Sequence, residues 1–139
     1  MNRDALLKSI RAHEGTKLKA YLDSEGVWTI GTGKNLQELT ITDEQAKVWL
    51  LDDVATAIRE LDRAFHGWRN HSEARQNVLI ELCFQLGAPR LAEFKKMWRC
   101  LALQDYAGAA LELLASKYAG QVPKRAHALA KRLETDSFE

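Results

Sequence analysis

Apolar residues recur at helical spacing over most of the chain, and they follow a strand-like pattern only near its start. An amphipathic stripe predicts a short helix over about residues 3–13, ending at Glu14 where a glycine follows. Residues 17–22 and 27–30 suit two strands, and residues 23–26 between them have the composition of a tight turn. The first third of the chain is therefore predicted to be a helix followed by a β-hairpin.

The rest of the chain has a helical period. Thr42, with Gln45 three residues later, predicts a capping box at the start of a long helix that ends near residue 66. Residues 78–87 are apolar nearly all round, which indicates a central helix buried by its neighbours and broken by Pro89. Three further helices are predicted at about 91–102, 105–115 and 123–134. These elements predict an α+β fold, predominantly α, with a small β-hairpin lobe and a larger helical lobe.

Composition narrows the class of protein. The chain has 139 residues and is 46% hydrophobic, which suits one domain with a real core. Its formal net charge of +1 argues against a general nucleic-acid binder. Residues 90–132 nevertheless carry nine basic and three acidic groups. This excess is compatible either with attraction to an anionic polymer such as cell wall or with ordinary solvated helix faces.

Cysteine, histidine and the N-terminal segment add three expectations. Cys83 and Cys100 lie in apolar helical contexts and are predicted to be free thiols in or near the core. The four histidines are scattered, so no metal site is expected. Charged residues interrupt the first fourteen positions, which excludes a secretory signal or a membrane span there. We therefore expect the protein to stay in the compartment in which it is made until something releases it.

Glu14, Asp23 and Thr29 are the candidate catalytic residues. They fall within sixteen residues around the predicted helix–hairpin junction. Taken singly, each has an ordinary explanation, because Asp stabilises turns and Thr favours strands. Two carboxyl groups in different surroundings are what hydrolysis of a glycosidic bond requires. The three residues together therefore predict a sugar-cleaving enzyme.

The segment around these residues, H-E-G-T-K-L-K-A-Y-L-D-S-E-G-V-W-T-I-G-T-G at 13–33, resembles the bacteriophage lysozymes of the T-even type. Two later motifs fit the same family, namely F-Q-L-G at 84–87 and Q-V-P-K-R-A at 121–126. The motifs occur in the family's order and span nearly the whole chain. Lys34 departs from the family, which commonly has His there, and residues 134–136 predict a different end for the last helix.

The resemblance implies a lysozyme-like fold with the active-site cleft between two lobes. Residues 1–139 would form one lysozyme domain. Its parts would be a β-containing catalytic lobe at about 14–41, an interlobe helix at about 42–66 and a helical lobe at about 67–139, with the helix at about 3–13 packed on that last lobe.

The resemblance also implies the chemistry. Glu14 would be the general acid, at a helix end where the dipole opposes a further negative charge. Asp23 and Thr29 would hold the attacking water on the opposite face of the sugar, so that the reaction inverts the anomeric carbon and needs neither metal nor organic cofactor. Four further positions match substrate-binding positions that line the family's cleft, of which the last would lie close to Glu14: Gly33, Phe84, Gln85 and Arg125.

The implied substrate is the β-1,4 bond between N-acetylmuramic acid and N-acetylglucosamine in peptidoglycan. The implied biology is phage host-cell lysis by a monomer, which waits in the host cytoplasm until a holin-type membrane protein releases it to the peptidoglycan of the periplasm. Two alternatives remain open at the level of sequence: a catalytically silent peptidoglycan-binding module, and a helical nucleic-acid-binding domain. The intact candidate residues argue against the first, and the absence of a recognition-helix signature argues against the second.

Overall fold

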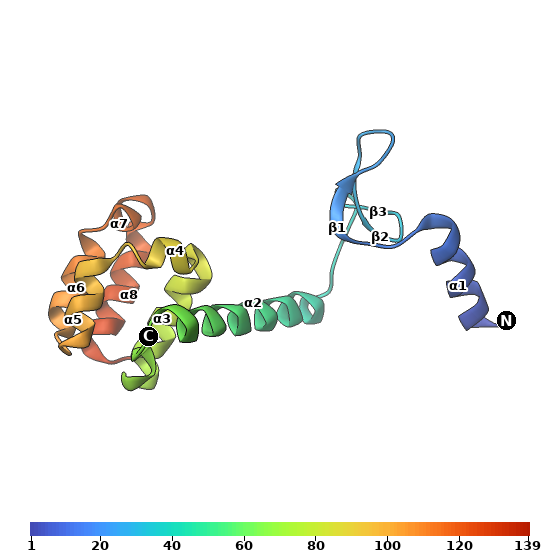
Figure 1. Cartoon of the computed structure of the whole chain (residues 1–139). Helices are drawn as coiled ribbons and strands as arrows, with labels where there is room; N and C mark the ends of the chain where they lie inside the picture. Colours follow the sequence, from blue (N-terminus) through green and yellow to red (C-terminus); the bar gives the residue numbers. More distant parts are fainter. The chain divides into compact units, whose positions relative to one another are not determined.

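The computed structural model describes all 139 residues, in two compact units that are described separately below (Figure 1). Unit 1 comprises residues 1–46 and unit 2 comprises residues 47–139. Helices account for most of the chain, and one small antiparallel sheet accompanies them. The predicted α+β, predominantly α fold class is confirmed. None of the helices combines the length and the apolar composition that crossing a membrane demands.

Unit 1 opens with helix α1, Arg3–Glu14. The Asn2 side chain caps the start of this helix by accepting a hydrogen bond from the Ala5 amide at 3.0 Å. It ends at Gly15, whose φ of 74° allows the chain to turn away. No residue of α1 is buried. The predicted packing of this helix on the helical lobe stays a prediction, as do the predicted boundaries of the lobes.

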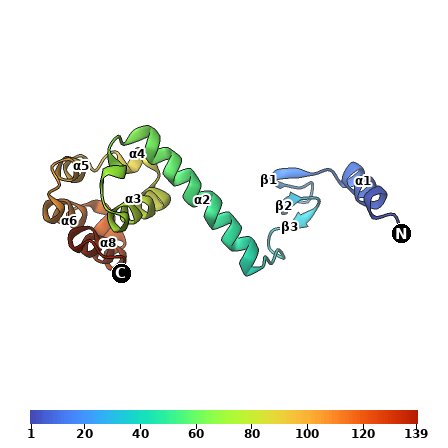
Figure 2. The same cartoon turned by 90° about the horizontal axis from the view of Figure 1, so that it is seen from below.

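The sheet of unit 1 has three antiparallel strands in the order β1–β2–β3 (Figure 2). Strand β1 is Lys17–Leu22, β2 is Trp28–Gly31, and β3 is Lys34–Asn35. The first two strands and their turn follow the prediction, with β2 shifted by one residue. The short third strand was not predicted. It pairs only with β2, through two residue pairs, and so carries no periodicity of its own.

Helix α2, Asp43–Ala64, begins with the predicted capping box. The Thr42 amide donates to Gln45 Oε1 at 2.9 Å, and the Gln45 amide donates to Thr42 Oγ1 at 3.1 Å. Ala57 and Leu61 in its second half are buried in the core of unit 2. The helix leads into the short 3-10 helix η1, Trp68–Asn70.

Unit 2 is a cluster of helices around α3, Glu73–Leu86. Ser72 caps α3, and Val78, Leu79 and Leu82 in its middle are completely buried. The predicted central helix is therefore confirmed. The helices that follow α3 are α4 (Ala88–Leu91), α5 (Lys95–Ala102), α6 (Tyr106–Leu114), α7 (Lys117–Gln121) and α8 (Pro123–Thr135).

Two predictions in this region were wrong. The helix predicted at about 91–102 is in fact α4 and α5 separated by a bend. At the bend, Phe94 leaves helical geometry and packs edge-on against Tyr118. The Leu91 carbonyl accepts two hydrogen bonds there, from the Phe94 amide at 3.2 Å and from the Trp98 indole at 3.0 Å. The central helix also ends at Gly87, with φ 79°, so that Pro89 lies inside the first turn of α4 instead of ending α3. Helix α7 had not been predicted.

The end of α8 is fastened to the start of α3. Asp136 adopts a left-handed conformation, with φ 58°, and so ends α8 one residue beyond the predicted stop. Its carboxylate accepts a hydrogen bond from the Ser72 hydroxyl and lies 3.6 Å from Arg75 Nη1. Arg75 also donates to two carbonyls of the last helical turn. The C-terminal segment is therefore held by side chains that lie 58 to 64 residues earlier in the chain.

Candidate active site

Glu14 is the last residue of α1 and faces the turn between β2 and β3. Within unit 1 its exposed carboxyl group forms no hydrogen bond and no ion pair. A Cβ atom built on Gly33 would lie 3.8 Å from Glu14 Oε2, so the carboxyl group rests over this glycine. The structure thus brings together Glu14, the predicted acid, and Gly33, one of the residues predicted to line the cleft. A carboxyl group without internal partners is available to exchange a proton with a bound ligand.

Asp23 begins the turn between β1 and β2. Its Oδ1 atom accepts hydrogen bonds from the Glu25 amide at 2.8 Å and from the Val27 amide at 2.9 Å. The turn is closed by Gly26, whose φ of 78° suits a residue without a side chain. Both bonds end on one oxygen, so Oδ2 retains its full capacity to accept hydrogen bonds.

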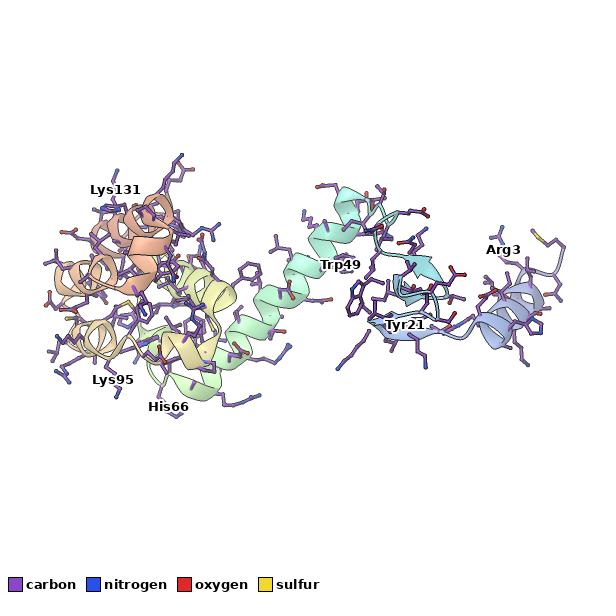
Figure 3. The ribbon with its side chains drawn as sticks, turned by 90° about the horizontal axis from the view of Figure 1, so that it is seen from above. Arg3, Tyr21, Trp49, His66, Lys95 and Lys131 are labelled. Atoms are coloured by element: carbon purple, nitrogen blue, oxygen red, sulfur yellow. The ribbon has the colours of Figure 1, made fainter.

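Thr29 lies on β2 and is the single buried polar residue of the protein, with 5% of its surface exposed. Its cross-strand partner is Tyr21, which is labelled in Figure 3. The hydroxyl donates to the Val27 carbonyl at 2.9 Å. Because its only hydrogen is committed to that bond, the Thr29 oxygen can act toward a further group only as an acceptor.

Asp23 and Thr29 are anchored on the same residue. The Val27 amide donates to the Asp23 carboxylate, while the Val27 carbonyl accepts from both the Asp23 amide and the Thr29 hydroxyl, each at 2.9 Å. The hairpin therefore holds the two side chains in a fixed relation to each other. Asp23, Thr29, Glu14 and Gly33 all belong to unit 1, and their catalytic roles stay predictions.

Gln85 and Phe84 lie near the end of α3 in unit 2. Gln85 Oε1 accepts a hydrogen bond from the Tyr118 hydroxyl at 2.7 Å, which fixes the amide orientation. Phe84 is 46% exposed beside a groove of about 420 Å³ between α2, α3 and α8. The structure thus shows one oriented amide and one exposed aromatic ring, and the predicted role of both residues in substrate binding stays a prediction. Tyr118 had not been singled out, because 33 residues separate it from Gln85.

Arg125 lies in the first turn of α8 and is exposed. Burial raises the pKa of the Tyr118 hydroxyl, and the nearby positive charge of Arg125 opposes that shift. Arg125 is therefore close enough to influence Tyr118 electrostatically. Arg125 and Glu14 belong to different units, so their predicted proximity stays a prediction.

Comparison with known proteins agrees with these features. The family model for phage lysozyme matches residues 11–136. The chain is 24% identical to "Probable T4-type lysozyme 2" of Dictyostelium discoideum, over 97% of this chain and 96% of that protein. It is 32% identical to the endolysin of Salmonella phage P22, over 82% of each chain. It is also 26% identical to "Peptidoglycan hydrolase gp36" of Pseudomonas phage phiKMV, over 91% of this chain but 15% of that protein.

The family match covers nearly the whole chain and includes Glu14, Asp23 and Thr29. It contains both the hairpin of unit 1 and the helices of unit 2. The chain therefore belongs to the phage lysozyme family and is a glycosidase.

Proposed function

We propose that this lysozyme cleaves the β-1,4 bond between N-acetylmuramic acid and N-acetylglucosamine in bacterial peptidoglycan. The observation that carries the proposal is the contrast between its two carboxyl groups. Glu14 has no hydrogen-bond partner within unit 1, whereas Asp23 is held by two backbone amides. A glycosidase needs such a pair, one group to give a proton and one to remain an anion.

The proposed reaction is a single displacement with inversion. Glu14 gives its proton to the oxygen that leaves the anomeric carbon. A water molecule on the opposite face attacks that carbon and loses one proton to Asp23 Oδ2. Its other hydrogen is hydrogen-bonded to Thr29 Oγ1 and remains on the new hydroxyl of the sugar. Both acceptors are free for this purpose, because Asp23 uses only Oδ1 for its turn and Thr29 donates its own hydrogen to Val27. Such a water requires the two carboxyl groups to be roughly 6.5–9.5 Å apart when substrate is bound.

Activity loss on removal of the acid tests this mechanism. Glu14→Gln keeps the size of the side chain but cannot deliver a proton, so lysis of permeabilised Gram-negative cells should fall to background. Glu25→Gln, which neutralises another exposed carboxyl of unit 1, is the matched control and should lyse cells normally. Lysis by Glu14→Gln at a rate near that of the wild type would refute the proposed acid. Cell-wall binding by the wild type without any lysis would instead favour a silent binding module.

The anomeric form of the first product tests the inversion. Proton NMR of a fresh digest should show the α-anomer before mutarotation, because inversion at a β-linkage yields α. An initial β-anomer would show retention, which proceeds through a covalent intermediate, and would refute the single displacement.

For biology, we propose a monomeric endolysin that acts in host-cell lysis. It would accumulate in the host cytoplasm and reach the periplasmic peptidoglycan once a holin-type membrane protein opens the inner membrane. The endolysin names of its phage relatives support this role. Expression of the chain alone in a Gram-negative host should leave cells intact until chloroform is added. Prompt lysis without chloroform would show that the chain needs no helper.

A further inference from the structure

Three side chains near Glu14 form a hydrogen-bonded chain that the proposed mechanism does not use. Arg11 Nε donates to Thr16 Oγ1 at 3.2 Å, and Thr16 Oγ1 lies 3.0 Å from Thr32 Oγ1. Arg11 is on α1, Thr16 is in the connection from α1 to β1, and Thr32 is in the turn between β2 and β3. This series of hydrogen bonds thus connects α1, the helix that ends in Glu14, to the turn beneath the Glu14 carboxyl group.

The direction of the first hydrogen bond is fixed by its donor. A guanidinium group can only donate, so Thr16 Oγ1 is the acceptor of the first bond. The hydrogen of Thr16 remains available for the second bond, in which either hydroxyl can be the donor. The two hydrogen bonds can therefore form at the same time, because they do not need the same hydrogen.

The hydrogen-bonded threonines lie close to Glu14. Thr16 follows Glu14 by two residues, and Thr32 precedes Gly33, over which the Glu14 carboxyl group rests. Thr32 lies between two glycines with positive φ, 68° at Gly31 and 80° at Gly33. Its neighbours therefore bring no side chain with which to pack this turn against the end of α1.

We infer, on the basis of the proposed acid role of Glu14, that Thr16 and Thr32, braced by Arg11, are positioning residues for the Glu14 carboxyl group. The hydrogen bond between the two hydroxyls holds the turn at 31–33 against the end of α1. It thereby fixes the distance between Gly33 and the Glu14 carboxyl group. None of the three side chains contacts the reacting atoms in this scheme. Their effect is on how well the proton of Glu14 is aligned with the leaving oxygen, and catalysis is sensitive to displacements of about 1 Å.

Valine substitution separates positioning from stability. Thr16→Val and Thr32→Val preserve the shape of the side chain and remove the hydroxyl. Both bonds are solvent-exposed, so each variant should melt within about 3 °C of the wild type. We expect kcat on soluble peptidoglycan fragments to fall about tenfold, with KM changed less than about twofold, because alignment matters in the transition state and not in binding.

Three comparisons sharpen this test. Thr16→Ser restores the hydroxyl and should keep kcat within about twofold of the wild type. The double valine variant should be no slower than Thr16→Val, because Thr16→Val already removes the bond in which Thr32 takes part. Thr40→Val removes an exposed threonine of the same unit that makes no hydrogen bond, and it should leave kcat and melting temperature unchanged.

The inference is overturned if the valine variants keep the kcat of the wild type, if their loss is confined to KM, or if Thr16→Ser is as slow as Thr16→Val. Glu14→Gln is measured alongside them. If Glu14→Gln is inactive while the valine variants are fully active, the positioning role alone fails. If Glu14→Gln is itself active, the proposed acid fails, and the positioning role fails with it.

Discussion

Replacing Arg75 with alanine should release the end of α8 from α3. Arg75 Nε donates to the Leu133 carbonyl at 2.7 Å, and Nη2 donates to the Glu134 carbonyl at 3.0 Å. Its guanidinium carbon also lies 3.5 Å from the centroid of the Tyr106 ring, and its side chain is only 14% exposed. The last carbonyls of a helix have no partner within the helix, so Arg75 satisfies groups that would otherwise depend on water.

The size of the effect follows from these contacts. Two hydrogen bonds from a charged donor contribute about 1.5 kcal/mol each, and the stacking on Tyr106 contributes about 1 kcal/mol. The ion pair with Asp136 is long and its carboxylate is 45% exposed, so solvent screening reduces it to no more than about 0.5 kcal/mol. Because water will partly replace Arg75 at the two carbonyls, we expect a net loss of about 3 kcal/mol in the free energy of unfolding. The melting temperature should fall by about 10 °C.

Urea unfolding followed by circular dichroism at pH 7 measures this loss. Arg99→Ala is the matched control, since Arg99 is an exposed arginine of unit 2 without an ion pair. Arg75→Lys should recover less than half of the stability, because an ammonium group cannot bind two carbonyls in the geometry of the guanidinium fork. If Arg75→Ala unfolds within about 0.5 kcal/mol of Arg99→Ala, the two carbonyl bonds do not hold the end of the helix as described.

Burial, and then the positive charge of Arg75, lower the pKa of His71 below its ordinary value of 6.5. The unfolded chain therefore binds a proton at His71 more readily than the folded chain, and the free energy of unfolding should fall as pH drops through 6.5 toward the folded pKa. His71→Gln should flatten this slope between pH 7.5 and 5. An equal slope in His71→Gln and in the exposed-site control His66→Gln would contradict the prediction. Gly33→Ala should lower the free energy of unfolding by about 1–2 kcal/mol, because a side chain at φ 80° is strained. It should also slow lysis, because the added methyl group would lie beneath the Glu14 carboxyl group. A variant with the melting temperature and the lytic rate of the wild type would refute both effects. The pKa of the Cys83 thiol is raised to about 12, first by burial and then by its hydrogen bond to the Glu60 carboxylate. A thiol reagent at pH 8 should therefore label this cysteine only after the protein unfolds. Mass spectrometry of peptides from labelled native protein checks this.

The sequence by itself determined the elements whose causes lie within a few residues. The apolar stripe and the glycine stop define α1, and the capping box between Thr42 and Gln45 starts α2. Pro123 opens α8 because its missing amide is not needed in a first helical turn. Spacing and motif also singled out Glu14, Asp23 and Thr29, since all three belong to one short helix–hairpin segment.

Tertiary structure decided what depends on partners far along the chain. The two-residue strand β3 exists only because β2 lies beside it, and Phe94 at the bend between α4 and α5 contacts Tyr118. Tyr118 likewise orients Gln85 across 33 residues. Thr16 and Thr32 are separated by sixteen residues and become neighbours only when the sheet brings the turn at 31–33 against the end of α1. No local pattern encodes such pairs, because each side chain is ordinary in its own segment and gains its role from a surface that another segment provides.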